Sequence, residues 1–137
     1  MKTIIALLIS ALILLCFSGN SFAAGINIKE GMWQLETSMT IPGMPHKMPS
    51  TTFTQCITKA TLIPPVNKED GCQIQDQSIN GNTLTYTMVC SHDGDTTTGH
   101  GSFNYSYDKM SGQLEITTNG MQFITSYQGK WTGPCQQ

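Results

Sequence analysis

The feature that most constrains the fold is an alternation of apolar and polar residues with a period of two. It begins at Trp33 and continues to Ile41, with Gln34 and Glu36 among the polar residues between the apolar ones. This period is typical of a half-buried β-strand. A second such stretch spans residues 50–57, and a third and fourth flank Asn80–Asn82. Apolar residues mark a fifth (Phe103, Tyr105, Tyr107), a sixth (Leu114, Ile116) and a seventh (Met121, Phe123, Tyr127, Trp131).

Turn signals separate these stretches, and no long segment has a helical period. Residues 58–71 are expected to form a helical turn or loop, because Pro64 and Pro65 cannot both lie inside a sheet. The sequence therefore predicts an all-β fold, an antiparallel meander of about seven strands. We expect a curved sheet or a small barrel, since a flat sheet of seven strands would leave an apolar face and two edges exposed.

The first residues are predicted to lie outside this fold. Lys2 is followed by an unbroken apolar run, and Ser21 and Ala23 are the small residues of a signal-peptidase site. We expect residues 1–23 to be a signal peptide and residues 24–137 a single β domain. Cys16 is preceded by Leu15 and lies inside the apolar run. A lipid anchor on this cysteine is therefore not expected.

Composition limits the possible cellular location and the possible binding partners. The seven basic residues are all lysine, against nine acidic residues, so no guanidinium is present to grip phosphates in pairs. Nucleic acid is therefore a poor partner. No second apolar run is long enough to span a membrane after the signal. The predicted location is periplasmic or secreted.

Four cysteines remain after the predicted cleavage: Cys56, Cys72, Cys90 and Cys135. An even number in a small exported domain is typical of two disulfides, for which three connectivities are possible. A zinc site would require closely spaced pairs, which this sequence lacks. The cysteines are therefore interpreted as structural.

The hairpin around Asn80-Gly81 selects one connectivity. A two-residue turn at Asn80-Gly81 would set Cys72 opposite Val89. A three-residue loop, Asn80 to Asn82, sets Ile74 opposite Met88 and Cys72 opposite Cys90, with Asn82 in the left-handed conformation. The second register buries one matched apolar face. It predicts a Cys72–Cys90 bridge, and by elimination a Cys56–Cys135 bridge.

Several segments, in order, resemble an exported bacterial family. They are EGMWQLETSMTIPGMP, TQCIT, CQI, NGNTLTYTMVC, GHGSFNY and the final GPC. The family is domain of unknown function 3617, and the resemblance covers nearly the whole mature chain. It implies a small periplasmic β domain with paired cysteines. It supplies no activity, ligand or catalytic residue.

The segment between the first two predicted strands combines soft metal ligands with proline. Met44, His46 and Met48 alternate in an extended segment, and thioether and imidazole groups suit Cu(I). The alternative is a stiff connector in which prolines end the strand and methionines cover the end of a sheet. We expect the connector, and keep the three residues as a candidate metal site.

Two other histidines also have both a functional and a structural interpretation. His92 and Asp93 combine a base with a carboxylate, but aspartate beside glycine more often forms a tight turn. His100 lies between two glycines, which marks a β-bulge or a close approach of the backbone. No nucleophile motif is present, so no catalytic residues, no cofactor and no enzymatic activity are expected.

The aromatic side chains should gather on one side of the sheet, where they form a core or hold an apolar ligand. The sequence therefore predicts an exported, noncatalytic binding or interaction domain of the cell envelope. Its expected partner is a small apolar molecule or another envelope protein. The alternative function is binding of copper by the methionine segment, residues 39–50.

Overall fold

The computed structural model describes residues 25–44, 48–63 and 71–136. The predicted signal peptide, residues 1–23, and the predicted loop residues Pro64 and Pro65 lie outside these ranges. Seven strands are present among the described residues, and none of these residues forms a helix that could cross a membrane. The strands are β1 (Gly31–Thr40), β2 (Thr51–Ile57), β3 (Cys72–Asn80), β4 (Thr83–His92), β5 (Asp95–Ser106), β6 (Lys109–Thr118) and β7 (Met121–Gly133).

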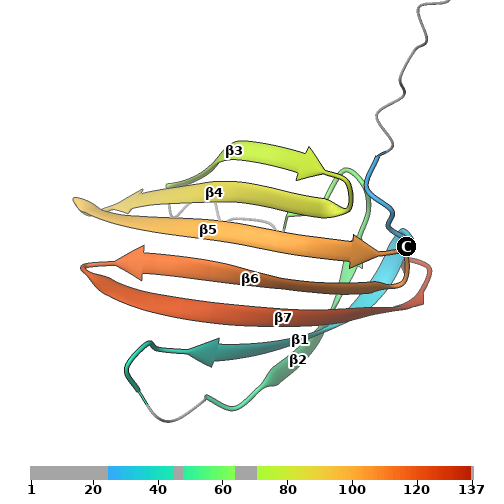
Figure 1. Ribbon diagram of the computed structural model, residues 1–137, viewed down its shortest axis with the longest axis horizontal. Helices are drawn as coiled ribbons and strands as arrows, with labels where there is room; N and C mark the ends of the chain where they lie inside the picture. The colour runs from blue at the N-terminus through green and yellow to red at the C-terminus, as the bar shows by residue number, and fades with distance from the viewer. Residues whose placement is uncertain (1–24, 45–47, 64–70, 137) are drawn as a thin grey trace, which may run out of the picture.

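All seven strands belong to one antiparallel sheet, in the order β2-β1-β7-β6-β5-β4-β3 (Figure 1). The all-β antiparallel prediction is therefore confirmed. The meander runs through consecutive strands from β3 to β7. The β1–β2 hairpin lies beside β7, because β1 pairs with β7 as well as with β2. The sheet is open, with β2 and β3 at its edges, so the small-barrel alternative was wrong.

The two faces of the sheet differ sharply in composition. One face carries the buried apolar residues of β1, β4 and β5, while the other carries mainly threonine, serine, glutamine and asparagine. The apolar face curls inward, since Phe103 of β5 and Tyr127 of β7 meet across β6 with ring centroids 5.3 Å apart. The aromatic residues thus lie mostly on one concave side, as the alternation predicts.

The β3–β4 hairpin has the predicted pairs but a different cause. Cys72 faces Cys90 and Ile74 faces Met88, as expected. The loop, however, contains two residues, Gly81 and Asn82, and the positive φ is at Gly81 (59°). The predicted three-residue loop and left-handed Asn82 were therefore wrong.

A β-bulge at Asp76 sets the register of this hairpin. Near the turn Asn80 pairs with Thr83, and this register changes by one residue between Gln75 and Ser78. Asp76 has a φ of 50°, in the left-handed region that aspartate tolerates better than most residues. The extra residue in β3 returns Ile74 to the apolar face.

The other hairpins turn tightly. Asp93-Gly94 and Asn119-Gly120 each have positive φ at both positions, as type I′ turns require. Between β5 and β6 the left-handed residue is Tyr107 (φ 57°), which is unfavourable for an aromatic residue. Backbone hydrogen bonds from Tyr107 N to Asn27 O and from Lys29 N to Tyr107 O, each 2.8 Å, hold this turn.

Candidate functional site

The concave apolar face is covered at one end by two segments. The first contains Ile26 and Ile28 and lies beside Tyr107 through a parallel bridge. The second follows β2 and contributes Leu62, whose carbonyl accepts a hydrogen bond of 2.9 Å from the buried Tyr105 hydroxyl. Trp33, Leu35 and Tyr105 are consequently almost inaccessible to solvent. This end of the face is the hydrophobic core.

Apolar side chains continue beyond the core along the same face. These side chains are neither fully buried nor fully exposed, and they come from β3, β4, β6 and β7. They are Ile74, Met88, Leu114, Ile116 and Phe123. We call these five residues the open apolar stretch. It is the part of the apolar face that stays partly accessible to solvent.

Glycines form the floor of the concave face. Gly101 faces Tyr86 across the β4–β5 ladder, and a Cβ at Gly101 would lie 2.5 Å from the Tyr86 ring. Gly112 lies beneath Phe103, and a Cβ at Gly112 would lie 2.3 Å from the Phe103 ring. The rings therefore lie flat along the sheet. Without these glycines the aromatic side chains could not lie so close to the backbone.

Burial also keeps the interior uncharged. It raises the pKa of Tyr105 to about 12 and raises the pKa of Tyr127. The pKa of Tyr86 is raised mainly by burial, with smaller contributions from Tyr127 and Tyr105. All three phenols are neutral at physiological pH, and burial extends this neutral state to higher pH.

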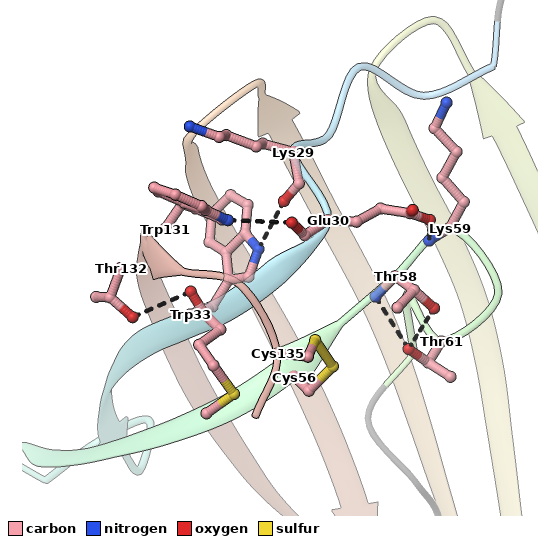
Figure 2. The surroundings of a disulfide bond; sticks show 11 residues. Lys29, Glu30, Trp33, Cys56, Thr58, Lys59, Thr61, Trp131, Thr132 and Cys135 are labelled. Atoms are coloured by element: carbon pink, nitrogen blue, oxygen red, sulfur yellow. Dashed lines mark hydrogen bonds between the residues drawn. A yellow bond between two sulfur atoms is a disulfide. The ribbon is translucent and has the colours of Figure 1, made fainter. Parts of the chain in front are cut away.

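Figure 2 shows a corner of the domain where Lys29 and Glu30, which precede β1, meet the last residues of β7. Contacts in this corner hold both ends of the domain in place. Trp33 donates its indole N–H to Lys29 O at 3.0 Å, and Trp131 donates its own to Glu30 O at 3.1 Å. The Lys29 ammonium lies 3.5 Å from the centroid of the Trp131 ring. Each indole donor thus has a backbone acceptor. These contacts give the corner a structural role.

A disulfide completes this corner. Cys56 of β2 is bonded to Cys135, which follows β7, with their Cα atoms 5.4 Å apart (Figure 2). The second disulfide, Cys72–Cys90, joins opposite residues of β3 and β4, with Cα atoms 3.9 Å apart. These are the two pairs derived from the sequence, and they suit an oxidising, extracytoplasmic setting.

The methionine segment begins with a turn. Met44 N donates to Ile41 O at 3.0 Å, and Gly43 has a φ of 87° after Pro42, which is the pattern of a type II turn. This turn is the exit from β1 that the sequence predicts. Met44 and Met48 are 63% and 44% exposed, whereas His46 lies outside the described residues.

The other histidines lie on exposed surfaces. His92 Nε2 lies 3.1 Å from Asp93 Oδ2 at the tip of the β4–β5 hairpin. Only Asp93 and Gly94 connect the two strands, so the prediction of a tight turn there is confirmed. His100 Nδ1 lies 3.3 Å from Thr87 Oγ1 on the polar face. The ladders of β5 run through His100 without a bulge, so the flanking glycines mark a close approach. Within the described ranges, no three His, Cys, Asp or Glu residues form a group that could hold a metal ion.

Sequence reasoning expected a bulge or a close approach at the glycines that flank His100, but it identified neither Gly112 as part of the glycine floor nor the bulge at Asp76. Gly99, Gly101 and Gly112 continue the apolar face of their strands in register, so glycine at period-two positions opposite aromatic residues was the available signal. Asp76 offered no comparable signal. Its conformation depends on the register of the complete hairpin.

A family model described as "Protein of unknown function (DUF3617)" matches residues 28–135. No curated protein and no solved structure matches the chain. The matched range includes all seven strands and all four cysteines of the two disulfides.

Proposed function

Because the chain belongs to the DUF3617 family, whose description assigns no function, we propose a function from the structure itself. The protein is an exported, noncatalytic binding domain of the bacterial cell envelope. Its concave face holds a small apolar molecule or an apolar segment of another envelope protein. The observation that carries this proposal is the open apolar stretch, which continues the hydrophobic core without being fully buried.

The chemistry of the stretch favours an apolar ligand. Leu114, Ile116 and Phe123 provide aliphatic and aromatic surface, while Met88 provides a flexible thioether chain that adapts to irregular shapes. The neighbouring tyrosines are neutral. An acyl chain or a similar hydrocarbon would bury this surface without leaving a charge unpaired.

Export is supported by the two disulfides and by the position of the first core residue. Ile26 is buried, whereas Gly25 is exposed. Cleavage after Ala23 would leave only Ala24 and Gly25 ahead of the core. A cut beyond Gly25 would begin to remove buried side chains, so the predicted site lies two residues before the limit that the fold permits.

A binding assay on matched variants tests the proposal. Ile116 faces the concave side, and its neighbour Thr117 is exposed on the polar face. Lysine at position 116 places a charge on the apolar surface, whereas lysine at 117 adds the same charge to the opposite face. We expect Ile116→Lys to weaken binding of a fluorescent fatty-acid analogue at least about tenfold, and Thr117→Lys to leave it unchanged.

Circular dichroism and thermal melting of both variants show whether each has folded. Equal binding of the probe by folded Ile116→Lys and Thr117→Lys would contradict a site on the concave face. Absence of probe binding by the unaltered protein would contradict the ligand class.

Exposure of Met44 and Met48 favours a second candidate function, the binding of Cu(I). Two thioethers lie on the surface of the β1–β2 connection, with His46 between them in the sequence. Thioether ligands select Cu(I) over harder ions. In this candidate, Met44, His46 and Met48 together supply the ligands.

Competition for Cu(I) against a chromophoric chelator tests this second candidate. Replacing Met44 and Met48 by leucine removes both thioethers but retains apolar side chains of similar volume. Loss of one bound Cu(I) in the double variant would support copper binding. Identical titrations of the variant and the unaltered protein would contradict it. The Met121→Leu variant is the control, since Met121 is similarly exposed.

A further inference from the structure

We propose that the edge strand β2 is a self-association surface, on which the β2 strand of a second copy adds in antiparallel orientation. The two sheets then form one continuous sheet across a two-fold axis. This inference is independent of the ligand proposed above. It rests on a difference between the two edges of the sheet.

Strand β2 itself, Thr51–Ile57, has none of the sequence features that protect an edge strand against strand addition. Its seven residues, Thr51–Ile57, contain no charge, proline or glycine. All seven pair with β1 in an unbroken register, so the strand is regular along its length. Threonine, phenylalanine and isoleucine also favour extended structure. An uncharged, regular edge of this kind is a template for another strand.

The opposite edge, β3, contains two features that oppose pairing. Its ladder is interrupted at Asp76, whose left-handed φ bends the strand. Asp76 is also the central residue of Cys72–Asn80, so self-pairing about the centre of β3 would set two carboxylates directly opposite each other. Both a bulge and like charges are unfavourable for edge pairing. Strand β3 thus has features that protect an edge, and the residues of strand β2 do not.

Self-pairing of β2 about its centre gives favourable neighbours. Thr54 would face Thr54 of the second copy, and Thr52 would face Cys56 of that copy. Threonine pairs are compatible with adjacent strands. A two-fold axis at Thr54 keeps all seven residues of each copy paired, since the same strand serves both sides of the interface.

Phe53 supplies the apolar contact of this interface. Its side chain lies on the concave side beside Leu35 and is 40% exposed, in contrast to the buried Leu35. In the proposed register the two Phe53 side chains are diagonal neighbours, a separation that aromatic rings can bridge. Strand addition would therefore cover an apolar ring that the single copy leaves partly in water.

Sedimentation velocity of the mature protein at increasing concentration tests this inference. The pairing of one short strand gives a small interface, so we expect a monomer–dimer equilibrium with a dissociation constant of about 10 to 100 µM. Thr54→Lys places two ammonium groups opposite each other at the centre. It should raise this constant at least about fivefold.

Gln75→Lys is the matched control, since it makes an exposed residue of the other edge strand lysine. We expect this variant to dimerise like the unaltered protein, while both variants keep the unaltered circular dichroism spectrum. A protein that stays monomeric at about ten times the expected constant would overturn the inference. Equal weakening by both substitutions would also overturn it, because it would show general charge repulsion or another interface.

Discussion

Trp33 of β1 and Tyr105 of β5 meet edge to face, with ring centroids 6.5 Å apart, although β7 and β6 lie between their strands in the sheet. Such a contact requires the sheet to curl around its apolar face. The curl makes one hydrophobic core possible in an open sheet. It also leaves the open apolar stretch on the same face only partly buried.

The first prediction concerns the glycine floor. Gly101→Ala would place a Cβ 2.5 Å from the Tyr86 ring, so the ring or the strand must shift. We expect a loss of about 1 to 3 kcal/mol in the free energy of unfolding, the range typical of overpacked cores. Urea denaturation measures this loss. Gly133→Ala is the control, because a Cβ there meets no atom within 4 Å; equal effects at both positions would show that close approach is not the cause.

The second prediction concerns the bulge. Deleting Asp76 removes the extra residue of β3 and leaves Cys72 opposite Cys90, so the protein should fold and keep this disulfide. Deleting Gln73 should not be tolerated in the same way. Either Cys72 then loses its position opposite Cys90 or Ile74 moves to the polar face.

Mass spectrometry of non-reduced peptides detects the Cys72–Cys90 link in each deletion variant. Loss of the link after deletion of Asp76, or its retention at full stability after deletion of Gln73, would show that the bulge does not set the register.

The third prediction concerns alkaline pH. Below pH 10 Tyr105 is protonated in both the folded and the unfolded protein, so it makes no pH-dependent contribution. Between pH 10 and its folded pKa of about 12, the unfolded chain releases a proton that the folded protein retains. The stability should therefore fall with rising pH, by about 3 kcal/mol at most from this residue, and Tyr86 and Tyr127 act in the same direction.

Unfolding free energies measured across this pH range test the prediction. Tyr105→Phe removes the titrating group together with its hydrogen bond to Leu62 O. This variant should be less stable near neutral pH by about 1 kcal/mol and should lose stability less steeply above pH 10. An unchanged slope would show that the titration of Tyr105 is not coupled to folding.

The fourth prediction compares the two disulfides. Cys56–Cys135 closes a separation of 79 residues and Cys72–Cys90 one of 18. The chain-entropy model gives about 4.5 kcal/mol for the longer loop and about 3 kcal/mol for the shorter. Replacing Cys56 and Cys135 together by alanine should lower the melting temperature more than replacing Cys72 and Cys90 together. The opposite order would indicate that entropy of the unfolded chain does not dominate.

Alternation and turn residues were sufficient to predict much of this fold. Strands such as Gly31–Thr40 follow directly from period-two patterns, and Asp93-Gly94 forms a turn through its own conformational preference. The pairing of β1 with β7 has no local signal, because it depends on how the complete sheet curls. The bulge at Asp76 is likewise set by the register of its hairpin.

The candidate site shows the same division. The sequence predicted an apolar face from its aromatic residues, but it could not separate the buried Trp33 from the half-buried Phe123. That distinction depends on where the segments containing Ile26 and Leu62 cross the sheet. The two segments that cover the apolar face are far apart in the sequence and come together only in the folded protein.

Native mass spectrometry of the protein purified from a bacterial periplasm tests the central claim most directly. We predict a chain that begins at Ala24, carries two disulfides and holds an additional apolar molecule that organic solvent releases. The extra mass should be lost in Ile116→Lys and kept in Thr117→Lys. A protein that shows only the mass of the bare chain, with the unaltered sequence and both variants alike, would contradict the account.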